Sequence, residues 1–276
     1  DGLELAFQPI PGVELRVRRQ FGPCVVETYT LSHRFSEPLL LTGWGISTPF
    51  RDVYPSALEC LRGACHAHVW TGGSLAYVWA LPMRGRGPGL GLALEKGRLW
   101  SYSIETRNTF TGSNIRGHIR LQATDAARAP HAFGGQPPLV IPPGADYTLQ
   151  WRLDWHPDFD TFQRRAFPDF PHCPRLAAPL GQPLVIEHPA ATQWTATPVE
   201  PATVRRPAAG RIEILADEPG VRHLDLDDGP RRMRIALLFH RPLPETVQRR
   251  AAAILARHRA TERAPDRAGA FLPVDT

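Results

Sequence analysis

Lysine is almost absent from this sequence. Only Lys96 among the 32 basic residues is a lysine, and all the others are arginine. Because the chain is also rich in Ala and Pro, we interpret this imbalance as a bias toward GC-rich codons. The net charge is +5, but the arginines are dispersed along the chain and form no basic tract of the kind that binds nucleic acid. We therefore expect no nucleic-acid partner.

Cysteine is also scarce. The four cysteines are too few for a disulfide scaffold in a chain of 276 residues. A bridge between Cys60 and Cys65 is one interpretation, and buried thiols are another. The redox compartment therefore stays open, and both a secreted and a cytoplasmic location are compatible with the sequence.

Long apolar runs and nucleotide-binding motifs are missing as well. The run from Leu39 to Leu41 is far shorter than the roughly 20 residues that a membrane-spanning helix needs, so we expect no membrane partner. The sequence contains no phosphate loop, GxSxG elbow or dinucleotide fingerprint, and we expect no cofactor. Because the chain opens on Asp1 without Met, we expect it to derive from a longer polypeptide.

What the sequence does contain is the alternation of apolar and polar residues that is typical of β-strands. It is clearest in residues 147–156, where the apolar positions are Tyr147, Leu149, Trp151, Leu153 and Trp155. This pattern predicts a half-buried strand of an antiparallel sheet, with Trp151 and Trp155 in the core. Shorter runs of the same kind, separated by Gly and Pro turns, recur along the chain and predict an all-β fold.

Proline and a late helical pattern divide the chain. Residues 166–183 are rich in proline and are predicted to be a linker between a β-sandwich at 1–165 and strands at 184–242. Those later strands form either a small subdomain or the end of the first sandwich. From Pro244 onward, apolar residues recur at helical spacing, so residues 243–276 are predicted to be a linker helix and the start of a further domain.

The most distinctive stretch runs from residue 65 to residue 74. His66, His68 and Trp70 alternate along a predicted strand and therefore share one face, and a Gly72-Gly73 pair then turns the chain. Upstream, residues 42–54 are predicted to be an irregular loop. The candidate contact residues of this loop are Trp44, Phe50, Asp52 and Tyr54.

Three kinds of chemistry fit these residues. A zinc site would need a second ligand pair far from Cys65 and His66, because the local spacing matches no usual zinc motif, so we predict no metal. A mutarotase-type acid and base would use His66 and His68 with Glu105. Exposed aromatic residues could instead stack on sugar rings, as in a carbohydrate-binding module.

Several segments together resemble the N-terminal β-sandwich region of a largely uncharacterised bacterial and fungal family of six-hairpin, glycosidase-like proteins. The resemblance covers most of residues 25–160 and the last thirty residues. The segments that carry it are Glu27–Phe35 with the following Ser36-Glu-Pro-Leu39, Gly45-Ile-Ser-Thr-Pro-Phe-Arg-Asp52-Val-Tyr54, Cys65-His-Ala-His-Val-Trp-Thr-Gly-Gly73, Leu90-Gly-Leu-Ala-Leu94, Ser101-Tyr-Ser-Ile-Glu105, residues 143–156, the terminal helix and Gly269-Ala-Phe-Leu272.

The resemblance implies an antiparallel β-supersandwich of the galactose mutarotase-like type that packs on an (α/α)6 barrel. In related glycoside hydrolases and phosphorylases the catalytic acids belong to that barrel. This chain would then be a non-catalytic accessory part of a carbohydrate-active enzyme. Its partners would be a C-terminal (α/α)6 domain of the same polypeptide and a carbohydrate. The residues of the 65–74 stretch and the 42–54 loop would form a docking or substrate-rim surface. The alternatives are a self-sufficient aldose epimerase and a carbohydrate-binding module.

Overall fold

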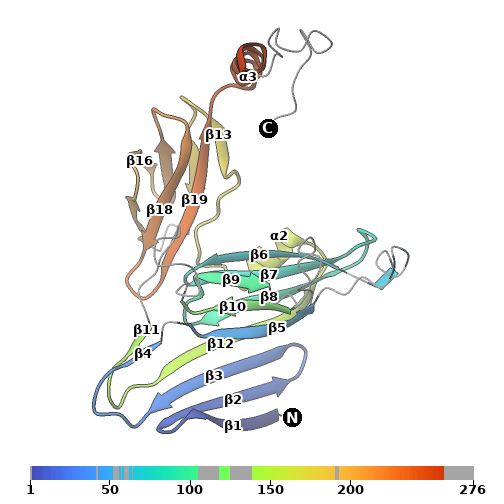
Figure 1. The fold of residues 1–276 in the computed structure, drawn as a ribbon, viewed down its shortest axis with the longest axis vertical. Helices are drawn as coiled ribbons and strands as arrows, with labels where there is room; N and C mark the ends of the chain where they lie inside the picture. The colour runs from blue at the N-terminus through green and yellow to red at the C-terminus, as the bar shows by residue number, and fades with distance from the viewer. Residues whose placement is uncertain are drawn as a thin grey trace, which may run out of the picture. The chain divides into compact units, whose positions relative to one another are not determined.

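The computed structural model describes residues 2–41, 43–51, 56, 58, 62–63, 65–104, 118–124, 139–189 and 193–257. They divide into two compact units. Unit 1 comprises Asp1–Phe170 together with Leu226–Arg234, and unit 2 comprises Pro171–Asp225 together with Ile235–Thr276. Most described elements are β-strands, as the sequence predicts (Figure 1).

Unit 1 is built on a seven-stranded antiparallel sheet with the strand order β1-β2-β3-β12-β8-β7-β6. Its strands are β1 (Gly2–Ile10), β2 (Val13–Phe21), β3 (Val25–His33), β12 (Tyr147–His156), β8 (Gly89–Lys96), β7 (Leu75–Pro82) and β6 (Cys65–Gly72). The first and last strands in this order, β1 and β6, are its two edges. Short turns with positive-φ glycines, such as Gly12 between β1 and β2 and Gly73 between β6 and β7, connect neighbouring strands.

We call the face of this sheet that carries Val78 and Leu92 its inner face, and the opposite face its outer face. The inner face packs against smaller sheets. The larger of these has the order β5-β10-β9, from β5 (Gly45–Arg51), β10 (His118–Gln122) and β9 (Ser101–Ile104). Between the two sheets lies a core in which Val78 and Leu92 of the large sheet pack with Phe50 and Leu121 of the small one. A pair formed by β4 (Leu39–Leu41) and β11 (Leu139–Ile141) contributes to a second apolar cluster.

Part of the outer face of the large sheet, at β7, β8 and β12, is covered by a helix, α2 (Phe159–Ala166). Phe162 of this helix is fully buried, and its ring stacks on that of Trp79 with 5.1 Å between ring centroids. Asp158 begins the helix by accepting a hydrogen bond from the backbone N–H of Thr161, 2.7 Å away. This helix was not predicted from the sequence, because eight residues show barely two turns of periodicity.

Gly72 and Gly73 turn the chain as predicted, and the structure shows why glycine is needed there. Gly73 has φ +86°, and a Cβ atom at this position would lie 2.5 Å from the carbonyl oxygen of Arg232. The neighbouring Ser74 N–H donates to the same carbonyl at 2.9 Å. The backbone of residues 232–234 therefore passes so close to this turn that no side chain fits.

Unit 2 contains two small sheets. One has the order β13-β19-β18-β15, from β13 (Ala177–Pro179), β19 (Arg232–His240), β18 (Gly220–Asp227) and β15 (Thr195–Pro198). The other has the order β14-β17-β16, from β14 (Leu184–Glu187), β17 (Arg211–Leu215) and β16 (Thr203–Ala208). Their buried residues include Ile186, Trp194, Ile214 and Phe239. The predicted late helix is confirmed as α3 (Leu243–Arg257).

Two local predictions are wrong. Residues 45–51 form the strand β5 and not an irregular loop, because Ile46, Thr48 and Phe50 alternate toward the core while Pro49 is tolerated on an edge strand. Trp155 is not a core residue, since it is 60% exposed whereas Trp151 is buried. Trp155 is still paired with Leu90 of β8, but the pairing of β12 with β3 stops at Leu153 opposite Val25, so Trp155 has no neighbouring strand on that side. No helix among the residues described here is long and apolar enough to cross a membrane.

Candidate functional site

The predicted row of His66, His68 and Trp70 lies on the outer face of the edge strand β6. Cys65, Ala67 and Val69, which alternate with these residues, pack against the core on the inner side. Both histidines are exposed, and in the register of the sheet His68 lies beside Trp79 and Trp70 beside Tyr77 of β7. The structure therefore brings the three residues together on one face, while their function stays a prediction.

Trp70 is held by an aromatic layer under α2. Its ring stacks on Tyr77 with 6.4 Å between centroids and 9° between planes, and Tyr77 in turn contacts Phe162 and Phe167. Burial raises the pKa of Tyr77 to about 12, so its hydroxyl stays protonated near neutral pH. Trp70 is thus an anchored part of this layer, and the two histidines are the surface that a partner could reach.

The surroundings of the histidines do not supply an acid or a metal site. Among the residues that the structure describes, no carboxylate is hydrogen-bonded to His66 or His68. No group of three or more metal-binding side chains occurs in the described parts of the chain. Glu105, which the mutarotase-type alternative would use, lies outside the described residues. Among the described residues the row thus has neither an acid partner nor a metal site, and both of its predicted roles stay predictions.

Of the other predicted contact residues, the two that the structure describes, Phe50 and Trp44, pack on the inner side of the sheet and not beside this row. Phe50 is 6% exposed and belongs to the core, which leaves almost no side-chain surface for a ligand. Trp44 is partly buried and packs edge-to-face on Tyr147 with 5.6 Å between ring centroids. Asp52 and Tyr54 lie outside the described residues, as does Cys60 of the proposed bridge to Cys65.

The structure adds a polar cluster that the sequence analysis missed, centred on Glu27 of β3. Arg19 Nε donates to Glu27 Oε1 at 2.5 Å, and Glu27 Oε2 accepts from Tyr29 Oη at 2.6 Å and from Trp151 Nε1 at 2.8 Å. The Glu27 side chain is only 14% exposed, whereas that of Arg19 is 42% exposed. Three donors thus satisfy one half-buried carboxylate on the inner face of the sheet.

Tyr29 in this cluster cannot act as a base near neutral pH. Burial, followed by the hydrogen bond to Glu27, raises the pKa of its hydroxyl far above the ordinary value. Its ring also packs edge-to-face on Trp151 with 5.3 Å between centroids. A signal for the cluster exists in the sequence, because Glu27 interrupts the inward-facing row Val25, Tyr29 and Leu31. A charge in an otherwise apolar row requires partners.

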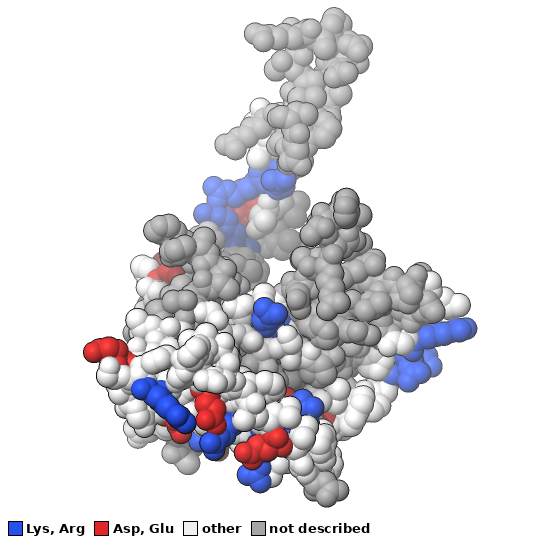
Figure 2. Space-filling view, turned by 60° about the horizontal axis from the view of Figure 1, so that its bottom comes forward, with Lys and Arg blue, Asp and Glu red and all other residues white. Residues whose placement is uncertain are grey.

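The outer face of the same sheet carries charges that neutralise one another. Arg16 pairs with Glu14, and Arg152 Nη1 lies 3.4 Å from Glu95 Oε1. In the view of Figure 2, blue and red side chains are interspersed over the lower part of the molecule. Surface pairs of this kind contribute little to stability and indicate a solvated face.

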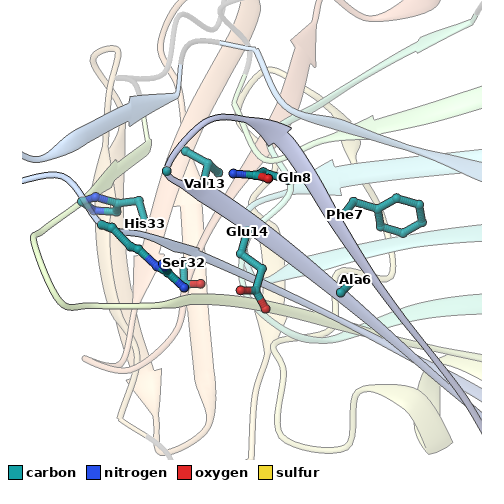
Figure 3. Close-up of a pocket in the computed structure, with 9 residues that line it drawn as sticks. Ala6, Phe7, Gln8, Val13, Glu14, Ser32 and His33 are labelled. Carbon is teal, nitrogen blue, oxygen red and sulfur yellow. The ribbon is translucent and has the colours of Figure 1, made fainter.

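A hollow of about 370 Å³ lies at one end of β1, β2 and β3 (Figure 3). Its histidine, His33, is already used by the protein: Nε2 lies 2.9 Å from the carbonyl oxygen of Ile141, and Nδ1 accepts from the N–H of Phe35 at 3.2 Å. Its carboxylate, Glu14, pairs with Arg16. The histidine and the carboxylate of this hollow therefore have structural partners, and we assign no site there.

Comparison with known proteins shows which solved fold this chain resembles. No protein-family model and no curated protein matches the chain. Among solved structures, that of polysaccharide lyase BACCELL_00875 is similar over 97% of this chain, with a TM-score of 0.78 and 24% sequence identity. The chain spans 40% of the length of that protein.

At this level of identity the likeness shows the fold. It confirms the all-β class with antiparallel sheets, and because it covers 97% of the chain, it includes both units. It does not show the six-hairpin, glycosidase-like family that the sequence resembles, nor a galactose mutarotase-like sandwich in particular.

Proposed function

We propose that this chain is the β-sheet part of a carbohydrate-active enzyme that acts on a polysaccharide. The observation that carries the proposal is the structural likeness to a polysaccharide lyase over 97% of the chain. Because that protein is more than twice as long, the likeness also fits a chain that works as part of a larger enzyme. The sequence resemblance to glycosidase-like proteins points independently to carbohydrate chemistry.

The role within such an enzyme is non-catalytic. On the surfaces that the structure describes, the exposed histidines have no acid partner and Glu27 already accepts three hydrogen bonds. The catalytic groups would belong to a further domain, for which the resemblance suggests an (α/α)6 barrel. His66, His68 and Trp70 would form the surface on which that domain docks or which borders its substrate cleft.

The reaction of the whole enzyme would be either elimination or hydrolysis. The structural neighbour is named a lyase, and the sequence resemblance favours a glycoside hydrolase. A lyase leaves a carbon–carbon double bond in one product, whereas a hydrolase adds water and leaves none. Ultraviolet absorbance of the products, measured beside the release of reducing ends, therefore separates the two reactions.

The test compares the 276-residue chain with the natural polypeptide that contains it, on a panel of neutral and acidic polysaccharides. We expect the full polypeptide to shorten at least one polymer and the 276-residue chain to shorten none. Loss of affinity for the polymer in the full polypeptide with His66→Ala and His68→Ala would support the docking or rim role. Turnover by the 276-residue chain that His66→Ala abolishes would refute the accessory role and favour the epimerase alternative.

A further inference from the structure

Arg19 is held in a fixed orientation on the inner face of the large sheet. Its Nε is bonded to Glu27 Oε1, and Glu27 is fixed in turn by Tyr29 and Trp151. Arg19 makes no other hydrogen bond or ion pair to the residues that are described. The two terminal nitrogens of the guanidinium are therefore available to donate hydrogen bonds to a ligand. The bond at Nε limits the orientations that they can adopt.

Apolar side chains lie on the same face of the sheet as this arginine. Leu3 of β1 is its direct partner in the register, and Phe21 is the next inward-facing residue on β2. Phe21 is 50% exposed, and Leu3 is also exposed. Trp155, two strands away on β12, belongs to the same face because it continues the row of Trp151 and Leu153.

The register gives the dimensions of this surface, which we call the Arg19 platform and define by Leu3, Arg19, Phe21 and Trp155. Strands lie about 4.8 Å apart, and residues on the same face of a strand lie about 6.8 Å apart. The Cα atom of Trp155 is therefore roughly 12 Å from that of Phe21 and roughly 17 Å from that of Arg19. This spacing is larger than one sugar ring and suits several consecutive sugars of a chain.

We propose that the Arg19 platform binds a polysaccharide that carries carboxylate groups, that is, a chain of uronic acids. Arg19 would donate both terminal N–H groups to one sugar carboxylate, since a guanidinium fork matches the two oxygens of a carboxylate. Trp155 and Phe21 would pack on the apolar faces of neighbouring sugar rings. The inference rests on the proposed function and adds to it a substrate class and a binding surface.

The chemistry of the cluster favours a carboxylate over a neutral sugar. Glu27 already accepts hydrogen bonds from three protein donors, two of them at Oε2. Its Oε2 therefore cannot accept a sugar hydroxyl without losing an existing bond. The exposed polar groups left to a ligand are the donors of Arg19, which carry a positive charge.

The experiment measures binding of three polymers to the 276-residue chain by calorimetry: polygalacturonate, its carboxyl-reduced form and dextran sulfate. We expect binding of polygalacturonate and weak or no binding of the reduced form. Arg19→Gln should weaken polygalacturonate binding about tenfold or more, which is the usual effect of losing a charge-assisted bond. Arg19→Lys should fall between the two, because lysine keeps the charge and loses the fork.

Arg18→Gln is the matched control. Arg18 is the preceding residue of β2, is exposed on the outer face, and loses the same charge on substitution. We expect this variant to bind polygalacturonate within about twofold of the unchanged chain, because diffuse attraction is screened by salt. Trp155→Ala should weaken binding roughly tenfold through loss of stacking. Urea unfolding of each variant shows whether Arg19→Gln has perturbed the fold. If it has, the comparison of Arg19→Lys with the unchanged chain provides the test instead.

Equal losses for Arg19→Gln and Arg18→Gln would overturn the proposal, as would equal binding of the acidic and reduced polymers. Binding of dextran sulfate with the same dependence on Arg19 would overturn the assignment to carboxylate. If no polymer binds while the full polypeptide still cleaves a polysaccharide, this inference fails and the proposed function stands. Binding that depends on Arg19, with no cleavage of any polysaccharide by the full polypeptide, would refute the proposed function alone.

Discussion

Replacing Gly91 with alanine should destabilise unit 1, because an aromatic ring occupies the space that a side chain would need. A Cβ atom on Gly91 would lie 2.4 Å from Cε2 and 2.5 Å from Cδ2 of Phe162. Carbon atoms in contact are normally about 3.5–4 Å apart, so the ring would have to move by about 1 Å. Gly91 lies in the Leu90–Leu94 segment that carries the family resemblance, and its position on the outer face gives that glycine a physical reason.

The ring has little room to move. Phe162 is fully buried, stacks on Trp79, and packs edge-to-face on His156 with 5.1 Å between centroids. Overpacking of this kind costs about 1–3 kcal/mol. Alanine is favoured over glycine in a strand by about 0.5–1 kcal/mol, which offsets part of that cost. The free energy of unfolding should therefore fall by about 1–2 kcal/mol.

Equilibrium unfolding in urea, followed by circular dichroism and tryptophan fluorescence, measures this change. Gly43→Ala is the matched control, because no atom lies within 4 Å of the Cβ that it would add, and it should change the free energy by less than about 0.5 kcal/mol. In a chain with Phe162→Leu, the smaller side chain leaves space, so Gly91→Ala should cost at least about 0.5 kcal/mol less. Equal unfolding midpoints for the Gly91 and Gly43 variants would refute the reasoning.

Three further predictions follow from contacts in the structure. Gly73→Ala should lower the free energy of unfolding in urea by at least about 2 kcal/mol more than Gly144→Ala does. Both glycines have positive φ, but only at Gly73 would the added Cβ meet backbone, at Arg232. Equal losses of free energy would contradict this. Glu27→Gln should lower the free energy of unfolding by about 2 kcal/mol, since its three partners are all donors and the amide nitrogen cannot accept; an unchanged urea midpoint would argue against the cluster. The pKa of His156 is lowered below 6.5, chiefly by burial; Arg165 and Arg152 assist this shift and Asp154 opposes it. The unfolded chain therefore binds the proton more readily than the folded chain, and stability should fall as the pH drops below 6.5. His156→Phe should weaken this acid dependence of the melting temperature, and an unchanged pH profile would show that other groups cause it.

The alternation of side chains was enough to predict which residues share a face. The strand at residues 147–156 and the shared face of His66, His68 and Trp70 both follow from the two-residue period. Alternation could not predict whether a face is covered, since that depends on where other strands end. Trp155 has the same pattern as Trp151, but β3 begins at Val25 and leaves Trp155 exposed.

Short elements with mixed composition were harder to predict. The strand β5 contains Gly45 and Pro49, which usually indicate a turn, and only its pairing with β10 makes it a strand. The Glu27 cluster depends on Arg19 and Trp151, which lie on different strands and meet only through the sheet register. Contacts between distant strands are set by tertiary packing, and local pattern does not contain them.

The most distinctive sequence motif and the polar cluster revealed by the structure lie on opposite faces of one sheet. His66 and His68 project from the outer face at the edge strand β6, whereas Arg19 projects from the inner face near the other edge. Because successive side chains of a strand point to opposite sides of the sheet, one small ligand cannot contact both sets. If both surfaces bind as proposed, their partners therefore differ. An exposed histidine pair above a rigid aromatic layer suits contact with another folded domain, and a fixed guanidinium beside exposed aromatic rings suits an acidic sugar chain. In this arrangement the sheet would join a substrate to the part of the enzyme that cleaves it, without supplying the cleaving groups.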